Sequence, residues 1–274
     1  MLVSNVVRKR DDGIINAVST PPTKLGWTAP LLVGVVVTGL WYFFSYVVLD
    51  RNRQFLLQPP HRVISKAFLE WDVLSEMLGG LASTTQVAAI GLAISVAFGL
   101  SVAVAMSQSR WLERGLWPYL VTLQAVPILA LVPLITFWFD TGQRARVVVC
   151  VLISFFPIVV NGLFGLRSAD RAAHDLFTLH NASALTRLRK LTLPAALPAI
   201  FAGLRIAAGL SVIGAIVGDF FFGQGDVGIG QLMRRYFRRV DGEELIGAVI
   251  LSSLLGVCVF TLFSVLERRV TRYY

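Results

Sequence analysis

The sequence predicts an all-α membrane protein with six transmembrane helices, and three observations support this class. Of the 274 residues, 55% are hydrophobic and only 15% are charged, which is too little charge for a water-facing surface. The 41 charged residues are unevenly spread and leave long charge-free runs. No alternating ten-residue pattern, which would indicate a transmembrane β-barrel, occurs in the sequence. A soluble domain is therefore not expected.

The charge-free runs give the positions of the helices, because a helix needs about 20 apolar residues to cross the hydrocarbon core. Five runs of 20 to 33 residues lie between charged residues, at Lys24–Asp50, Glu76–Arg110, Arg114–Asp140, Arg146–Arg167 and Glu244–Glu267. A sixth, Leu191–Gly218, is interrupted only by Arg205. Backbone groups in lipid must hydrogen-bond internally, so each run is expected to form one helix.

These spans divide the chain into a tail (1–24), a first transmembrane helix (25–49), an extracytoplasmic segment with a short helix (50–76), a five-helix core (77–266) and a second tail (267–274). The first run is too long for a signal peptide and is expected to be retained. An even number of spans places both termini on one side. Lys and Arg number 14 on that side and 10 on the other, so the positive-inside tendency puts both termini in the cytoplasm.

Few residues have side chains that could catalyse a reaction or bind a metal or a nucleotide. His61, His174 and His180 lie outside the spans without the spacing of a zinc-binding HExxH motif. Cys150 and Cys258 lie in apolar runs and are expected to pack as small apolar residues. No glycine-rich phosphate loop is present, so the chain has no visible means of binding ATP. The net charge of +9 is not gathered in a basic domain, which favours a membrane surface over nucleic acid as its partner. An enzyme is not expected.

The segment between the fourth and fifth spans carries most of the functional signal. Asp170 is placed to cap a short helix in which Leu176 and Leu179 share one face. Asn181 tolerates the left-handed conformation that ends a helix, and Ser183 is placed to cap a second helix. The two are predicted to form a helix-turn-helix on the membrane surface, after which a Leu-Pro pair opens the next span.

From Asp175 to Ile206 the chain reads DLFTLHNASALTRLRKLTLPAALPAIFAGLRI, which resembles the EAA loop of bacterial ABC-importer permeases. That pattern is Glu-Ala-Ala, a glycine six residues after the Glu, and Leu-Pro at the end. The corresponding residues here are Asp175, Leu176, Phe177, Asn181, Leu193 and Pro194. The stretches LLQPPHRVISKAF, QAVPILALVPLITFWF and FFPIVVNGLFGLRSAD extend the resemblance over most of the chain. Together they resemble the branch serving sulfonates, taurine, nitrate and thiamine-precursor pyrimidines.

The resemblance implies a type I ABC-importer permease of the bacterial inner membrane, which forms the translocation path for a small solute. It implies separate ATP-binding subunits that hold ATP and Mg, an extracytoplasmic solute-binding protein, and a second permease subunit, most simply a copy of this chain. The chain itself is expected to bind no cofactor. Residues 170–194 would form the ATPase-coupling loop, and the apolar face Leu176, Phe177 and Leu179 suits docking into a partner groove. An amphipathic hairpin lying on lipid is the alternative.

Several polar positions within the spans have two interpretations each. Gln124, Pro127 and Asn161 either line the translocation path or hold helices together by hydrogen bonds. Arg205 either snorkels to the interface or has a function inside the membrane. Asp219 is expected near the headgroups at a helix end, with a gate or docking role as the alternative.

An arginine-rich stretch precedes the last span and includes Arg234, Arg235, Arg238 and Arg239. Three interpretations stay open: interfacial anchoring with Tyr236 and Phe237 dipping into lipid, docking to an acidic rim of the solute-binding protein, and attraction of an anionic solute.

The rival class is a secondary transporter driven by an ion gradient. It would need acidic relays within the membrane and commonly shows two related halves. Asp140 and Asp219 are the carboxylates considered for such a relay, both stand at outer span ends, and no internal repeat is visible. A channel would need a filter sequence, and nothing resembles one. The solute itself is not readable from the sequence.

Overall fold

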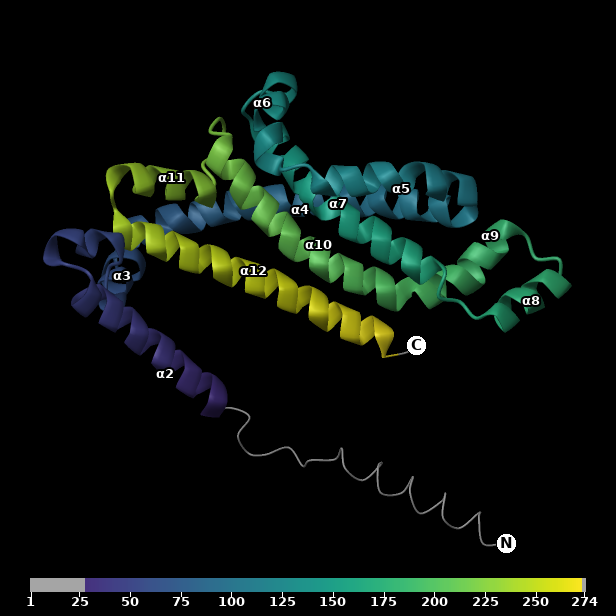
Figure 1. Cartoon of the computed structure of the whole chain (residues 1–274), viewed down its shortest axis with the longest axis horizontal. Coiled ribbons are helices and arrows are strands. Elements are labelled where there is room, and N and C mark those ends of the chain that lie inside the picture. The colour runs from purple at the N-terminus through teal and green to yellow at the C-terminus, as the bar shows by residue number, and fades with distance from the viewer. Residues whose placement is uncertain (1–27, 273–274) are drawn as a thin grey trace, which may run out of the picture. The chain divides into compact units, whose positions relative to one another are not determined.

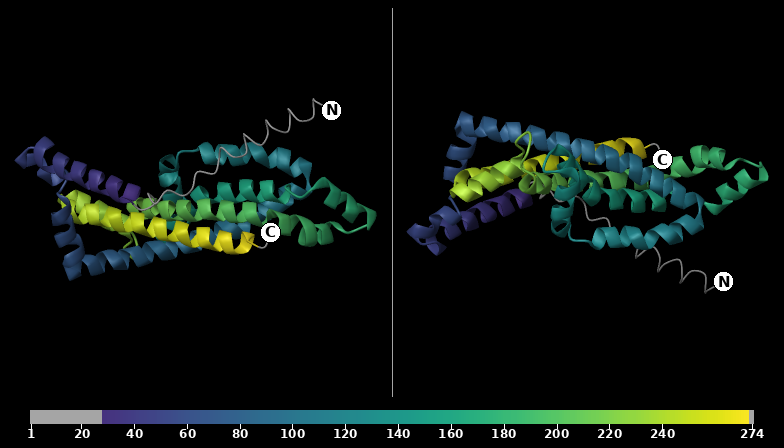
Figure 2. Two further views of the ribbon diagram at one scale, coloured as in Figure 1. Left: turned by 90° about the horizontal axis from the view of Figure 1, so that it is seen from below. Right: turned by 90° about the horizontal axis from the view of Figure 1, so that it is seen from above.

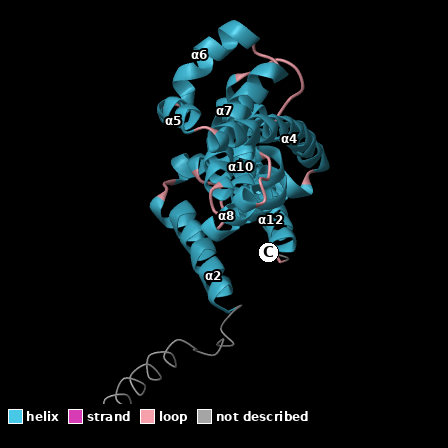
Figure 3. Ribbon diagram, turned by 90° about the vertical axis from the view of Figure 1, so that its right-hand side faces the viewer, coloured by secondary structure: helices cyan, strands magenta, loops and turns pink. Residues whose placement is uncertain are grey.

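The computed structural model describes residues 28–272, so the predicted N-terminal tail (1–24) lies outside the described residues. Within them, every regular element is a helix, as Figure 3 shows. The chain divides into two units, one ending at His61 and the other beginning at Arg62.

The first unit contains one long apolar helix. Helix α2 (Thr28–Phe43) continues as the wide-turn helix η1 (Phe44–Val48), and the 21 residues together are long enough to cross a membrane. The 3-10 helix η2 (Arg51–Leu56) follows. Ser45 Oγ donates a hydrogen bond of 2.9 Å to the Leu57 carbonyl, and Trp41 Nε1 donates one of 3.0 Å to the Gln58 carbonyl. These bonds hold the following segment against the end of the helix.

The short helix α3 (Pro60–Val63) spans the division between the units. The second unit contains η3 (Ile64–Leu69), α4 (Trp71–Gln108), α5 (Arg110–Ala125), α6 (Ile128–Phe139), α7 (Gln143–Leu166), α8 (Arg171–Leu179), α9 (Ala184–Arg187), η4 (Leu188–Thr192), α10 (Leu193–Phe221), α11 (Ile229–Arg239) and α12 (Gly242–Thr271). Helix α10 packs along α7 and against α12, and α7 packs along α4 (Figures 1 and 2). These four helices form the core that positions the connecting segments.

Small residues allow the core helices to approach closely, as expected for membrane helices. A Cβ atom at Gly99 of α4 would lie 2.9 Å from Cγ2 of Ile158. One at Gly214 of α10 would lie 2.9 Å from the Cα of Cys150, and one at Gly91 would overlap the Cys150 side chain. Cys150 is buried, so its role as a small packing residue is confirmed, whereas Cys258 is exposed on α12 and the same expectation fails for it.

The prediction of one continuous helix over 115–139 is wrong. Helices α5 and α6 meet at a bend of 99°. Val126 is extended there, with φ −69° and ψ 124°, because the ring of Pro127 disfavours the helical conformation in the residue before it. Within residues 28–272, five helices are long and apolar enough to cross a membrane, and six are counted when α5 and α6 form one broken span.

The fifth span also begins earlier than expected. Instead of a separate surface helix followed by a new span, α9, η4 and α10 form one continuous helical segment, Ala184–Phe221, of 38 residues. Pro194 lacks an N–H and its ring crowds the preceding turn, which normally interrupts a helix. The wide turn of η4 ends at Thr192, two residues before this proline, and joins α9 to α10 without a break.

Candidate functional site

The coupling-loop segment folds as its capping residues predicted. The Asp170 side chain accepts a hydrogen bond of 3.4 Å from the Ala172 N–H and caps α8. Asn181 has φ 48°, the left-handed conformation that ends α8. Ser183 Oγ accepts a 3.2 Å hydrogen bond from the Thr186 N–H and caps α9. The helix-turn-helix therefore follows from local side-chain chemistry.

The apolar residues of α8 point away from the core. The exposed fraction is 53% for Leu176 and 81% for Leu179, Phe177 is half-buried, and Asp175 is exposed. Figures 1 and 2 show α8 and α9 extending past the end of α7. This helix thus presents apolar side chains on a projecting loop.

The second half of the coupling segment is held by the core. Leu188 and Leu193 pack against a buried cluster that includes Met106 of α4 and Val159 of α7, and Pro194 is half-buried. Leu193 and Pro194 therefore anchor the segment, whereas Leu176 and Leu179 are its free face.

A buried polar cluster lies between α4, α7 and α10, where the sequence predicted none. Arg146 Nη1 donates to Asp219 Oδ1 at 3.0 Å, and the Thr84 hydroxyl donates to Asp219 Oδ2 at 2.5 Å. Arg146 Nη1 also donates to the Asp226 carbonyl at 3.0 Å, and the Ile229 N–H donates to Thr84 Oγ1 at 2.9 Å. The cluster therefore joins three core helices to the start of α11.

Both charged residues of this cluster are buried. Arg146 bounds a predicted span and Asp219 lies near the end of α10, where the sequence predicted a helix end, yet their side chains are only 1% and 0% exposed. The attraction between the two charges offsets part of the cost of removing them from water. A Cβ atom at Gly228 would overlap the Asp219 carboxylate, so glycine is required for the loop to approach it.

The positions proposed for the translocation path do not come together. Gln124 and Pro127 are exposed at the bend between α5 and α6. Asn161 is half-buried at the crossing of α7 and α10, where its Nδ2 donates to the Pro157 carbonyl at 2.8 Å and its Cβ faces Gly203. Asn161 thus takes part in helix packing.

All four outer arginines line one hollow of about 380 Å³ beside α11, together with Gly223, Val227 and Gln231. Arg235 forms an ion pair with Glu76, and the Tyr236 hydroxyl donates to Glu76 Oε2 at 3.2 Å. Tyr236 is buried, so the prediction that it dips into lipid is wrong, while Phe237 is exposed. Burial, and then the nearby Glu76 carboxylate, raise the pKa of Tyr236 above its usual value.

Arg205 has protein partners. Its Nη1 lies 2.9 Å from Glu267 Oε2, and its guanidinium lies 5.4 Å from the centre of the Phe260 ring. It therefore ties α10 to the end of α12. No group of three or more His, Cys, Asp or Glu side chains that could hold a metal ion occurs among residues 28–272.

The chain is similar to known transport proteins. A family described as the inner membrane component of binding-protein-dependent transport systems matches residues 73–272. A formylaminopyrimidine transport permease of Halalkalibacterium halodurans is 32% identical over 240 residues, which cover 87% of this chain and 92% of that protein. A putative aliphatic sulfonates transport permease of Escherichia coli is 31% identical over 240 residues, covering 88% of this chain and 89% of that protein.

The fold also matches a solved structure. An inward-facing conformation of the MetNI methionine ABC transporter superposes with a TM-score of 0.65 at 16% identity, covering 73% of this chain and 99% of the matched chain. This confirms the all-α, type I importer-like fold. The relatives confirm the branch indicated by the resemblance and a transport component rather than an enzyme. The chain therefore belongs to the family of multi-pass inner-membrane permease components of binding-protein-dependent ABC importers.

Proposed function

We propose that this permease forms the translocation path for a small solute and that its coupling loop receives the movement of a separate ATP-binding subunit. The observation that carries the proposal is the exposure of Leu176 and Leu179 on α8, which extends past the end of α7. Exposed apolar residues at helical spacing on a polar background are typical of a helix that inserts into a partner groove. ATP and Mg would be held by that partner.

The outer hollow suits a second partner. Arg234, Arg238 and Arg239 line it and form no ion pair with any described carboxylate. Such a surface is complementary to an acidic rim, and charged rims of this kind govern the rate of association. We propose that the extracytoplasmic solute-binding protein docks here. The transported solute would be a sulfonate, nitrate or a thiamine-precursor-like compound. The names of the two similar permeases support a sulfonate and a pyrimidine, and nitrate is supported by the sequence resemblance alone.

The proposed assembly pairs this chain with a second permease subunit, most simply another copy, in a bacterial inner membrane. Both termini would lie on the cytoplasmic side, as the Lys and Arg distribution favours. Cysteines introduced at positions 4 and 272 should resist an impermeant thiol reagent applied to intact cells. Reaction at both positions would invert this topology.

The coupling proposal is tested with Leu176→Ala combined with Leu179→Ala. Truncating two central contact residues at an interface costs about 2 to 4 kcal/mol, so binding of the ATPase subunit should weaken about 30- to 1,000-fold. The measurements are co-purification of the ATPase subunit from membranes and uptake of solute. Leu262→Ala is the matched control, because Leu262 is 56% exposed but lies within the span α12.

Retention and uptake equal to the unaltered chain in the double variant would show that α8 is not the docking helix. The ion-gradient alternative would then be examined by uptake without ATP. Docking of the binding protein is tested separately by Arg238→Glu with Arg239→Glu, which should reduce stimulation of ATP hydrolysis by the loaded binding protein. Arg144→Glu, exposed on α7, provides a single-site control for charge reversal, and it changes the charge by half as much as the pair.

A further inference from the structure

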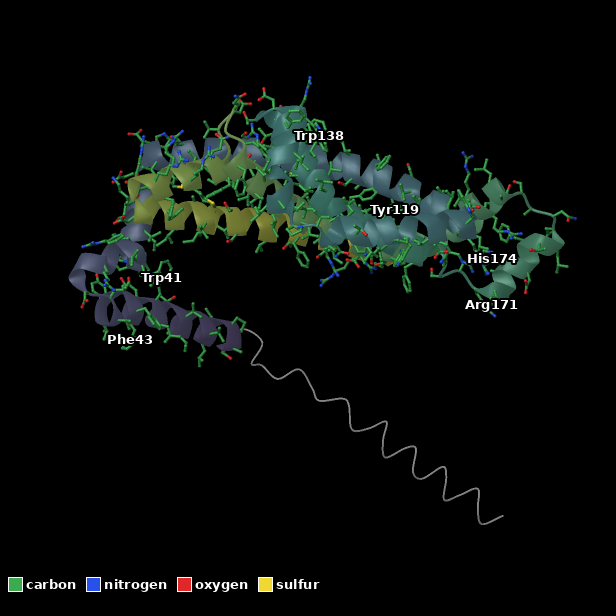
Figure 4. The ribbon with its side chains drawn as sticks, turned by 45° about the horizontal axis from the view of Figure 1, so that its top comes forward. Trp41, Phe43, Tyr119, Trp138, Arg171 and His174 are labelled. Atoms are coloured by element: carbon green, nitrogen blue, oxygen red, sulfur yellow. The ribbon has the colours of Figure 1, made fainter. Side chains whose placement is uncertain are left out.

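A second basic hollow lies at the opposite end of the core from the outer arginines. Its volume is about 520 Å³, and it opens between the ends of α4 and α7 and the two helices of the coupling loop. Arg167, Arg171, His174 and Arg187 line it, and its lining contains no carboxylate among the described residues. Figure 4 shows Arg171 and His174 on this projecting end. The hollow is therefore a concentrated positive site.

Two of its cations are uncompensated. Arg167 forms an ion pair with Glu113 through both guanidinium nitrogens, which raises the pKa of Arg167 above its usual value. Arg171 and Arg187 form no ion pair within residues 28–272. Two guanidinium groups facing one cavity repel each other unless an anion lies between them.

Arg187 has one hydrogen-bond acceptor and one nitrogen without a partner. Its Nη2 donates to Thr178 Oγ1 at 3.0 Å, which links α9 to α8. Its Nε is shielded from solvent and has no hydrogen-bond partner in the structure. The Nε groups of Arg146 and Arg205 are in the same state, so the support for a ligand comes from the charge of Arg187 and not from this nitrogen.

The hollow lies where two long apolar helices end. Gln108 is the last residue of α4 and Leu166 is the last residue of α7, and both line the hollow together with Thr192 of the continuous segment Ala184–Phe221. In a membrane, the phosphate groups of a phospholipid leaflet would lie near the ends of such helices. Guanidinium groups bind phosphate through two parallel hydrogen bonds, and Arg171 and Arg187 both line the hollow.

We propose that this hollow is a phosphate-binding site in which Arg171 and Arg187 hold the headgroup of an anionic phospholipid. The bound phosphate would neutralise the two facing cations, which would stabilise α8 against α9. The composition of the leaflet would thereby act on the segment that is proposed to couple to the ATPase. The site itself depends only on the permease chain, so it can be tested without the other subunits.

The experiment measures lipid retention by native mass spectrometry of the purified full-length chain. The probes are phosphatidylglycerol and monoglucosyl diacylglycerol with the same acyl chains, of which only the first carries phosphate. We expect retention of phosphatidylglycerol alone, and an increase in its Kd of about tenfold or more in Arg171→Gln with Arg187→Gln. The charge-matched control is Arg189→Gln with Lys190→Gln, because both residues are exposed and neither lines the hollow.

Equal loss of phosphatidylglycerol in the control variant Arg189→Gln with Lys190→Gln would indicate diffuse attraction to a basic surface and would overturn the proposal. Unchanged retention of phosphatidylglycerol in Arg171→Gln with Arg187→Gln would overturn it as well. Displacement of phosphatidylglycerol by inorganic phosphate would support the site and show that soluble phosphate also reaches it. Resistance to displacement would support the lipid as its source. If the double variant fails to fold because the contact between Arg187 and Thr178 is lost, Arg171→Gln alone is tested. Arg171 is exposed, so this single variant keeps the fold and should still weaken binding.

Discussion

Replacing Arg146 by methionine should destabilise the core more than any change at its surface. The substitution keeps much of the side-chain volume but leaves the Asp219 carboxylate, 0% exposed, without its cation. Removing one partner of a buried ion pair typically costs about 3 to 5 kcal/mol, because the remaining charge is uncompensated. For a domain of this size, that corresponds to a fall in melting temperature of about 6 to 20 °C.

The assay is thermal unfolding of the purified chain in detergent, followed by tryptophan fluorescence. Arg144→Met is the control, because Arg144 is exposed two residues earlier on the same helix, and its melting temperature should stay within about 2 °C. Adding Asp219→Asn to Arg146→Met removes the stranded charge and should recover part of the loss. Equal melting temperatures for the two single arginine variants would refute the reasoning.

Four further predictions follow from the same structure. Asn181→Val should speed amide exchange across its turn and Asn181→Gly should not, because a β-branched residue at φ 48° costs about 1 to 2 kcal/mol. Gly214→Ala should lower the melting temperature, whereas Gly209→Ala, whose Cβ meets nothing within 4 Å, should not. The pKa of Tyr236 is raised in the folded chain, so the contribution of Tyr236 to stability is complete below the usual tyrosine pKa of about 10. This contribution is lost as the pH rises through the raised pKa. Glu76→Gln should lower the pKa of Tyr236, as measured by ultraviolet titration. The isolated chain should hydrolyse no ATP until a separate subunit is added, and robust hydrolysis by the chain alone would contradict this.

The helices were predictable because crossing lipid depends on composition over about 20 residues. The caps at Asp170 and Ser183 were predictable because they depend on one side chain and the next turn. The bend at Val126 was not predictable, because the sequence pattern gives the length of an apolar run and not the direction of the helix within it.

The polar cluster was missed for another reason. Arg146 and Asp219 are 73 residues apart, and each stands near the end of an apolar run, where a charge is ordinarily assigned to the interface. The signal that could have found them was the combination of opposite charges at matching ends of two neighbouring spans. Only the packing of α10 along α7 brings them together.

The unbroken segment Ala184–Phe221 has a mechanical consequence. Its 38 residues extend about 57 Å, so a tilt of about 5° applied at α9 displaces the far end by about 5 Å. That far end is fastened to α7 by the pair Arg146–Asp219. If the segment Ala184–Phe221 rotates, it must therefore either move α7 with it or bend at η4, where the wide turn makes bending least costly. Under the proposed coupling, the segment would act as a rod with one flexible joint, at η4, near the end that receives the movement.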